Sequence, residues 1–205
     1  MRPGTVIVAN PASGPGEAIN SRYASVIAAA RERGLVVYGY VDSDYGAVDV
    51  ESVVGQGRIH RSWYAVDGVF LDRTAPDDSS LPHYTAIADQ LHDAGLSVAF
   101  NAGQPEVDRR YLDVADHVVL FEGPMISYFA SRFPAWTRDV PSNRIWHLVY
   151  DVATADAMQH VLAHAELCNA GMAFVTDGVL PSPWDHLPPY WELEQEQLAK
   201  LTRTH

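Results

Sequence analysis

The chain has 205 residues, of which 47% are hydrophobic and 20% are charged. This length suffices for one domain with a full core, and it lies near the lower limit of about 200 residues for an eight-stranded (β/α) barrel. The net charge of −12 would repel a phosphate backbone, which argues against nucleic acid as a partner. No apolar run approaches the roughly 18 residues of a membrane-spanning helix, so we expect no membrane partner. We therefore expect residues 1–205 to form a single domain.

The start of the chain, Met1-Arg2-Pro3-Gly4, enters the first predicted strand directly and leaves no room for a signal peptide. As written, the protein is expected in the cytoplasm; it would be secreted if the chain is a processed form. The sequence does not indicate an oligomeric state.

Short apolar runs alternate along the chain with segments of helical periodicity. Runs rich in β-branched and aromatic residues predict strands near residues 5–10, 35–41, 68–72, 97–101, 117–122, 144–150 and 172–176. Apolar residues spaced three and four apart predict helices near residues 17–33, 48–64, 81–94, 109–115, 125–133, 154–170 and 188–201. Gly34, Gly95 and Gly171 each separate a predicted helix from the next strand, where a left-handed residue closes a helix.

This alternation predicts right-handed βαβ units and a parallel sheet. The fold class that we expect is α/β, a TIM-barrel-like (β/α) barrel. Seven strands are predicted, one short of closure, so either an edge strand is hidden in a segment read as loop or the barrel is incomplete. The strands near 5–10 and 172–176 should flank the gap, because they are first and last in the sequence. The proline-rich and aromatic chain after Gly178 is suited to cover their unpaired edges. Direct closure of the two strands, or a second subunit, would also serve.

Polar side chains stand where the predicted strands end. These residues are Asn10, Asp42, Asp72, Asn101, Glu122 and Asp177. Parallel barrels and doubly wound sheets place their chemistry at the carboxyl ends of strands. The strand ends therefore predict the position of a binding or catalytic site.

Asp72 and Glu122 are the carboxylates best placed for acid and base catalysis, because each ends a buried strand. A partly desolvated acid can stay protonated near neutral pH while its partner is ionised, which is the division of roles that glycoside hydrolysis needs. Acids at strand ends also cap helices, so the position alone does not decide between a catalytic and a structural role. The sequence does not say which residue is the acid. A carboxyl separation of about 5–5.5 Å would indicate retention, and about 6.5–9.5 Å inversion.

Residues 10–16 imitate a dinucleotide-binding turn, with Asp42 at the end of the next strand. The third glycine is missing, since position 19 is Ile, and Pro15 removes a backbone donor. The alternatives are a tight turn and a pocket lined by Asn10. A nucleotide-dependent enzyme stays a third hypothesis.

Aromatic residues such as Tyr40 and Tyr45 lie near the predicted strand ends, where flat rings can stack on sugar faces. His160 and His164 stand one helical turn apart near Glu166, but no second cluster completes a metal site. We therefore expect neither a metal nor a cofactor.

Several segments together resemble the spherulin-4-like family (spherulation-specific family 4). They are Asn10-Pro11-x-Ser13-Gly14-Pro15-Gly16, Gly39-Tyr40-Val41-Asp42-x-Asp44-Tyr45-Gly46, Trp63-Tyr64, Gly68-Val69-Phe70-Leu71-Asp72, Asn101-Ala102-Gly103, Phe121-Glu122 and Val175-Thr176-Asp177. The resemblance implies a (β/α)-barrel glycoside hydrolase that acts on galactosamine-containing polysaccharide, with Asp72 and Glu122 as catalytic acids. We expect the polysaccharide or oligosaccharide substrate to contact Asn10, Tyr40, Asp42, Tyr45, Arg73, Asn101 and Asp177.

The chain departs from the family pattern in two places. The family has an Asp-Glu pair where this chain has Asp72-Arg73, and it begins with one more strand. A cation beside Asp72 would lower the pKa of that carboxyl and spoil it as a general acid, unless Arg73 turns away, as adjacent strand residues do. The alternative function is therefore a non-catalytic carbohydrate-binding barrel that has lost activity.

Overall fold

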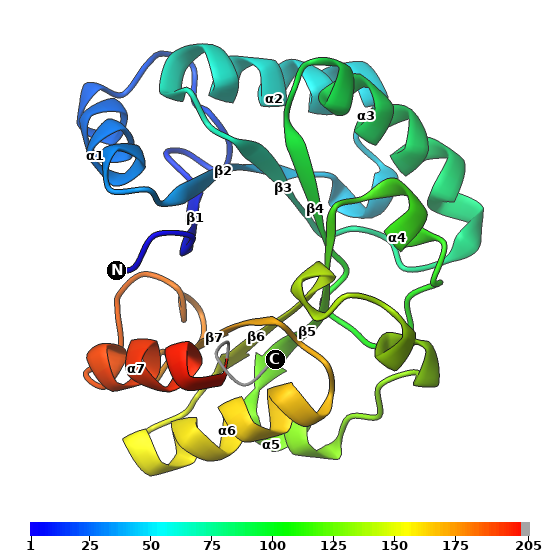
Figure 1. Ribbon diagram of the computed structural model, residues 1–205. Helices are drawn as coiled ribbons and strands as arrows, with labels where there is room; N and C mark the ends of the chain where they lie inside the picture. Colours follow the sequence, from blue (N-terminus) through cyan, green and yellow to red (C-terminus); the bar gives the residue numbers. More distant parts are fainter. Residues whose placement is uncertain (202–205) are drawn as a thin grey trace. The chain divides into compact units, whose positions relative to one another are not determined.

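A computed structural model describes residues 1–201 of the chain (Figure 1). Within these residues it has seven strands: β1 (Val6–Ala9), β2 (Val36–Asp42), β3 (Gly68–Asp72), β4 (Ser97–Asn101), β5 (His117–Pro124), β6 (Ile145–Tyr150) and β7 (Met172–Val175). Their order in the sheet is their order in the chain, and the pairs β1–β2, β2–β3, β3–β4 and β6–β7 are parallel. The predicted strands and their parallel arrangement are confirmed.

A helix follows each strand of the described chain. The helices are α1 (Ser21–Glu32), α2 (Val50–Tyr64), α3 (Leu81–Asp93), α4 (Tyr111–Val114), α5 (Met125–Ala130), α6 (Ala155–Leu167) and α7 (Trp191–Leu201). Side chains cap three of them at the N-terminus, since Asn20, Asp49 and Thr154 accept hydrogen bonds from the backbone of α1, α2 and α6. Across the described residues, no helix combines the length and the apolar character that a membrane crossing requires.

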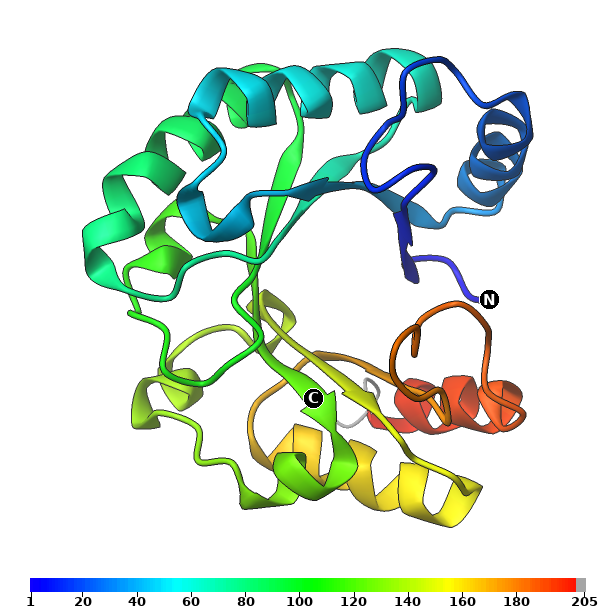
Figure 2. The same cartoon turned by 180° about the vertical axis from the view of Figure 1, so that it is seen from behind.

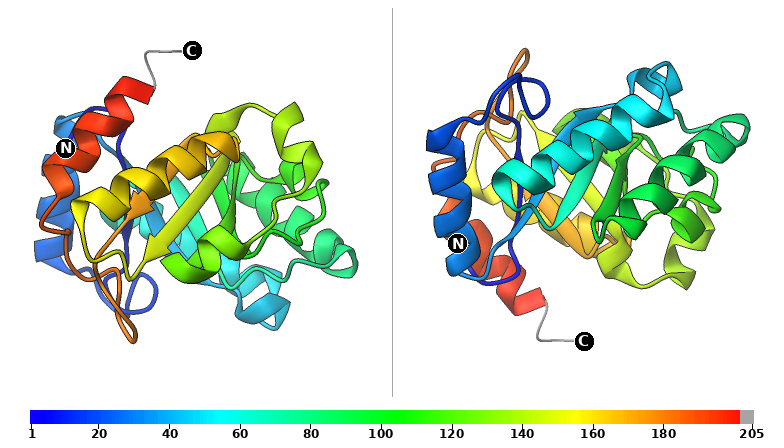
Figure 3. Two further views of the ribbon diagram at one scale, coloured as in Figure 1. Left: turned by 90° about the horizontal axis from the view of Figure 1, so that it is seen from below. Right: turned by 90° about the horizontal axis from the view of Figure 1, so that it is seen from above.

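The chain divides into two compact units. Unit 1 comprises residues 1–102 and 108–118, and unit 2 comprises residues 103–107 and the chain from 119 onward. In unit 1, helices α1, α2 and α3 lie on one face of strands β1 to β4 (Figure 2). In unit 2, α6 runs alongside β6 and β7 (Figure 3).

The core of unit 1 is centred on β3, which was predicted to be buried on both faces. Val69 and Leu71 have no exposed surface, and Phe70 between them is 5% exposed. Leu91 of α3 and Gly57 of α2 meet above this strand, and a Cβ on Gly57 would lie 2.6 Å from Leu91 Cδ2. This close approach packs α2 against α3 and against Val69 near the start of β3.

Unit 2 has its own hydrophobic core between its strands and α6. Val149 of β6 and Val175 of β7 are fully buried, as are Met158 and Val161 of α6. Tyr190, just before α7, joins this cluster and donates a hydrogen bond to the carbonyl of Val152 at 2.8 Å. The segment after β7 is thus part of the core of unit 2.

Strands β1 and β7 are the two ends of the strand order, as predicted. At β7, Oε1 of Glu194 from α7 accepts a hydrogen bond from the Val175 backbone N–H at 2.9 Å. The rings of Trp184 and Trp191 pack against Phe174, each with centroids 5.9 Å apart. The chain after Gly178 therefore covers the β7 edge, and that part of the prediction is confirmed.

Glu194 itself is fully buried, and its Oε2 has no hydrogen-bond partner in the part of the chain that the structure describes. Burial raises the pKa of Glu194 to about 8, because the buried ionised form loses its hydration. The Glu194 carboxyl group thus supplies the Val175 N–H with the hydrogen-bond acceptor that an eighth strand would otherwise provide.

One predicted helix end is wrong. Gly34 and Gly95 have φ values of 76° and 70° and follow α1 and α3 as expected. Helix α6, however, ends at Leu167, and the left-handed residue is Asn169, with φ 61°. Gly171 is needed for a different reason, since a Cβ there would lie 2.5 Å from the Ser142 carbonyl carbon.

Candidate functional site

The polar strand-end residues form separate clusters in the two units. In unit 1, Tyr40, Asp72 and Asn101 come from the ends of β2, β3 and β4, and we call them the Asp72 cluster. In unit 2, Glu122 and Asp177 come from β5 and from the residues just after β7.

Asp72 is held by a hydrogen bond to each of its carboxyl oxygens. The Tyr40 hydroxyl donates to Oδ2 at 2.7 Å, and the Asn101 Nδ2 amide donates to Oδ1 at 2.7 Å. Burial raises the pKa of the Tyr40 phenol, and its hydrogen bond with Asp72 raises it further, so the hydroxyl stays protonated and serves as a donor. The carboxylate is therefore oriented by two neutral donors from the strands on either side.

Tyr40 is positioned in turn by His60, which sequence analysis did not select. His60 of α2 is fully buried, and its Nε2 lies 2.8 Å from the Tyr40 carbonyl oxygen, so the protonated nitrogen donates. The imidazole occupies the space beside Gly39, where a Cβ would lie 2.4 Å from His60 Cγ. The bare glycine lets a helix side chain reach the backbone of β2 next to Tyr40.

Arg73 turns away from Asp72 and is held by two other acids. Its Nε donates to Asp42 Oδ1 at 2.8 Å and its Nη2 to Asp42 Oδ2, while Nη1 lies 2.8 Å from Asp44 Oδ1. Burial acts to raise the pKa of Asp42, but the hydrogen bonds from Arg73 and from the Asp44 backbone N–H bring it below its ordinary value. We call Asp42, Asp44 and Arg73 the Arg73 clamp; it carries one net negative charge.

The loop beside the Arg73 clamp has an unusual backbone. Asp44, Tyr45 and Arg73 have φ values of 46°, 55° and 51°, in the left-handed region that side chains disfavour. The Tyr45 N–H donates to the Arg73 carbonyl at 2.8 Å, and the guanidinium lies 5.6 Å from the centre of the Tyr45 ring. Tyr45 remains 60% exposed. Strained residues of this kind concentrate at functional sites, and the clamp holds the ring where a ligand can reach it.

Asn10 engages a different partner from the rest of unit 1. Its Oδ1 accepts a hydrogen bond from the Gly14 N–H at 3.0 Å, which stabilises the turn after β1. Its backbone carbonyl accepts a hydrogen bond from the Tyr23 hydroxyl at 3.2 Å. A role for Asn10 in substrate binding stays a prediction.

Glu122 in unit 2 is contacted by the segment that follows β7. The indole Nε1–H of Trp184 donates to Glu122 Oε1 at 3.2 Å. The Trp184 ring also meets Tyr150 edge-on, with centroids 5.8 Å apart, and packs against Phe174. A tryptophan thus lies over the ends of β5, β6 and β7.

Asp177 pairs with His186 of the same segment. His186 Nε2 lies 3.3 Å from Asp177 Oδ1, and its Nδ1 lies 2.7 Å from Asp185 Oδ1. The hydrogen bond with Asp185 raises the pKa of His186, and the nearby Asp177 carboxylate raises it further. Sequence analysis missed His186 because this residue meets its partners only when the loop folds back. The signal that could have identified it was its position in a strand-end loop beside Trp184.

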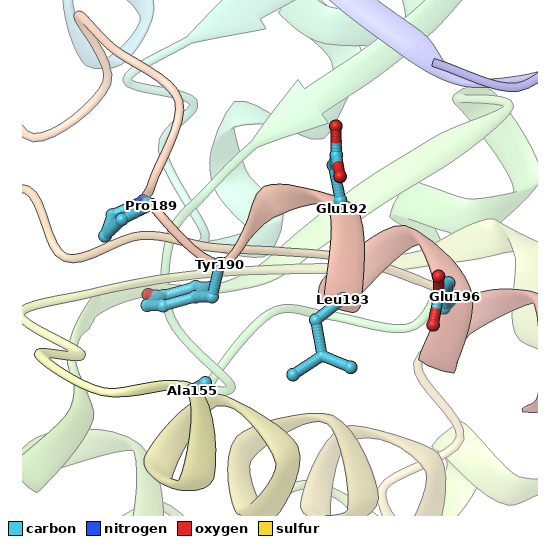
Figure 4. Close-up of a pocket in the computed structure, with 6 residues that line it drawn as sticks. All are labelled: Ala155, Pro189, Tyr190, Glu192, Leu193 and Glu196. Atoms are coloured by element: carbon cyan, nitrogen blue, oxygen red, sulfur yellow. The ribbon is translucent and has the colours of Figure 1, made fainter.

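A pocket of about 480 Å³ lies elsewhere in unit 2, beside the start of α7 (Figure 4). It is lined by Ala155, Pro189, Tyr190, Glu192, Leu193 and Glu196. These residues do not include any strand-end carboxylate, so the pocket does not mark the candidate site. In the described residues there is no group of three or more His, Cys, Asp or Glu side chains that could hold a metal ion.

The fold and these clusters define a barrel-like α/β protein whose polar and aromatic side chains gather at the carboxyl ends of parallel strands. The family model of spherulation-specific family 4 matches residues 3–197. The chain therefore belongs to spherulation-specific family 4, as its sequence motifs predicted.

Solved structures with the same fold include Aspergillus clavatus Sph3 in complex with GalNAc, with a TM-score of 0.83, 20% identity, and 96% of this chain and 86% of that chain covered. The Rhizomucor miehei chitinase RmChi1 has a TM-score of 0.51 at 11% identity, covering 96% of this chain and 93% of that chain. The Arthrobacter aurescens adenine deaminase has a TM-score of 0.52 at 13% identity, covering 91% and 57%. The expected TIM-barrel-like fold with seven strands is confirmed. Curated protein sequences include no match.

Proposed function

We propose that this protein is a glycoside hydrolase that cleaves a galactosamine-containing polysaccharide, with Asp72 and Glu122 as its catalytic carboxylates. The similarity to Sph3, which was crystallised with GalNAc, supports the sugar class. Family membership and the strand-end position of both acids support the assignment.

The observation that carries this proposal is the geometry of Asp72. Both carboxyl oxygens accept hydrogen bonds from neutral donors, Tyr40 and Asn101, which fixes the plane of the carboxylate without neutralising its charge. A purely structural acid at a strand end would instead cap a helix or pair with a cation. This orientation supports a role of Asp72 in chemistry on a bound molecule.

The contacts of Arg73 support a catalytic role for Asp72 despite the departure at position 73. Asp42 and Asp44 bind the Arg73 guanidinium on both of its sides, so its positive charge is more than balanced. The expectation that Arg73 spoils Asp72 as a general acid is therefore weakened, because Asp42 and Asp44 balance the charge of Arg73. We infer that Asp72 acts as nucleophile or base and that Glu122 protonates the leaving oxygen.

The test is hydrolysis of an N-acetylgalactosamine polymer by the purified protein, measured as reducing ends released. Asp72→Ala and Glu122→Ala should each lower kcat by at least about 10³-fold, the scale expected when a catalytic group is lost. Asp93→Ala removes an exposed carboxylate at the end of α3 and serves as the control with unchanged kcat. Unchanged turnover in both test variants would reject the assignment.

The role of Asp72 is tested separately by the anomeric configuration of the first product, followed by proton NMR. A nucleophilic carboxylate forms a covalent glycosyl intermediate and gives retention, whereas a base that activates water gives inversion. Rescue of Asp72→Ala by azide, with a glycosyl azide of inverted configuration, would identify the nucleophile.

A non-catalytic sugar-binding protein is the second candidate, and the Arg73 clamp is the observation that favours it. The clamp places a cation where the family pattern has a second acid. Sugar binding by calorimetry without hydrolysis, together with hydrolysis gained in Arg73→Glu, would support this function. Under the first proposal Arg73→Glu lowers activity, because three carboxylates then repel each other at residues 42, 44 and 73.

A further inference from the structure

We propose that residues 178–187, which we call the strap, form a sugar-binding subsite in which the Trp184 ring is the stacking platform and His186 is the anchor. This inference rests on the proposed function and extends it, because it names the residues of unit 2 that hold the carbohydrate next to Glu122. The ligand class is a pyranose ring with an apolar face, within an N-acetylgalactosamine oligomer.

Trp184 has the contacts of a ring fixed for stacking. Its polar edge is tied down, since Nε1–H donates to Glu122 Oε1 at 3.2 Å. Tyr150 meets the ring edge-on and Phe174 supports it at a tilt of 45°. The side chain still has 37% of its surface exposed. A rigid aromatic ring with an accessible area loses little entropy on binding a sugar face, which suits a platform.

Because Trp184 lies next to Glu122, its ring can also position that carboxyl group. A sugar stacked on Trp184 would lie within reach of the carboxyl group that donates the proton in the proposed reaction. The indole N–H meanwhile holds Oε1 of Glu122 and thereby orients the carboxyl group toward the stacked sugar. Trp184 is thus both a contact for substrate and a positioning residue for Glu122.

The strap is attached to the body of unit 2 through His186. Its imidazole bridges Asp177, just after β7, and Asp185 of the strap itself. These two carboxylates are the charged groups that face the imidazole ring of His186, and both favour its imidazolium form. Deprotonation removes the positive charge between two acids and weakens the attachment. Sugar affinity should therefore be highest at acidic pH and should fall as the pH rises through the pKa of His186.

The experiment uses the full chain and NMR of its indole N–H groups, of which the sequence has five. The resonance that disappears in Trp184→Phe is that of Trp184. Titration with an N-acetylgalactosamine oligomer should shift this resonance in the wild type, and the same titration gives the dissociation constant. Trp184→Ala should weaken binding at least tenfold, and Trp184→Phe, which keeps a ring, should weaken it less.

Trp191→Phe is the matched control, because Trp191 packs on the same Phe174 ring without a contact to Glu122. It should change affinity less than twofold. His186→Ala should weaken binding at pH 6 and abolish the pH dependence between pH 6 and 8. Binding by Trp184→Ala equal to that of the wild type, or an unmoved Trp184 resonance at saturation, would overturn the subsite.

Failure of the subsite and failure of the proposed function give different patterns. If the wild type hydrolyses the polymer and Trp184→Ala does so with unchanged KM, only the subsite is wrong. If the wild type neither binds nor hydrolyses the polymer while its circular dichroism is that of a folded α/β protein, both proposals are wrong.

Discussion

The hydrogen bond from Tyr40 to Asp72 at the candidate site depends on a single atom, the phenolic oxygen of Tyr40. Tyr40→Phe removes this donor and leaves the ring in place. A hydrogen bond to a charged group contributes about 1.5–3 kcal/mol, so kcat on the polymer should fall by roughly 10- to 100-fold with little change in KM. Tyr38→Phe, two residues earlier on β2, is the control. Equal kcat values for the two variants would show that Tyr40 does not orient Asp72.

The buried Glu194 should make the stability of unit 2 depend on pH. Its folded pKa of about 8 lies above the ordinary value of 4.5, so the folded state favours the protonated form. The stabilising contribution is full below pH 4.5 and is lost as the pH rises toward 8. Glu194→Gln, which stays neutral and keeps an acceptor for the Val175 N–H, should resemble the wild type at pH 5.

At pH 8, Glu194→Gln should be more stable than the wild type by on the order of 2–4 kcal/mol, measured by urea unfolding. A difference between the two proteins that does not change from pH 5 to pH 8 would contradict the buried, neutral acid. Glu192→Gln, an exposed acid on the same helix, is the control.

The candidate site residues at the strand ends were easier to predict than the residues that hold them in place. Asp72 and Asn101 end apolar runs in the sequence, and their contact follows because neighbouring parallel strands end at the same edge of the sheet. His60 and His186 have no such pattern. Their partners are a backbone carbonyl and two loop carboxylates, and these contacts exist only after tertiary folding.

Among the elements of the fold, the segment after β7 is predicted to be indispensable for a folded, soluble protein. Truncation after residue 180 removes Glu194, Trp184 and Trp191, which leaves the Val175 N–H unsatisfied and the Phe174 ring uncovered. An exposed strand edge of this kind pairs with other chains. The truncated protein should aggregate or unfold, as measured by size-exclusion chromatography and thermal melting. A soluble monomer with unchanged Tm would show that the β7 edge is protected in another way.

Element ends were the least predictable part of the fold. The predicted helix 188–201 begins at Trp191, because Pro188 and Pro189 precede the first helical turn. Helix α6 closes on Asn169 because Gly171 is required for the approach of the Ser142 backbone. The second difference comes from a contact between elements, which a periodicity within one element does not contain.

At the scale of the whole molecule, the two units should respond differently to alkaline pH. The pKa values of Glu194, His186 and Cys168 are raised, and all three residues belong to unit 2. The contributions of Glu194 and His186 are lost as the pH rises through neutrality, whereas that of Cys168 is lost only above its ordinary pKa of 9.0. In unit 1, acids such as Asp42 and Asp116 have lowered pKa values and lose their contribution only on acidification.

Hydrogen exchange measured by mass spectrometry, corrected for the intrinsic effect of pH, should therefore show protection falling in unit 2 before unit 1 between pH 7 and 9. Glu194→Gln should delay this loss. Equal loss of protection in both units, unaffected by the substitution, would contradict the assignment of the alkaline sensitivity to unit 2.

The number and order of strands in the described chain could be predicted from the sequence, since each strand is a separate apolar run and βαβ units have one favoured hand. The division into two units could not, because β5 contributes to both and no linker or change of composition marks the boundary.

The packing of His60 beside Gly39 has a consequence for sequence variation among related proteins. A methyl group at position 39 and an imidazole at position 60 cannot occupy the same space, since the two atoms would be 2.4 Å apart. A residue larger than glycine at position 39 therefore requires a smaller residue at position 60. Among homologues, alanine or serine at position 39 should occur with a small residue at position 60, and Gly39→Ala should regain stability when His60→Ala is added.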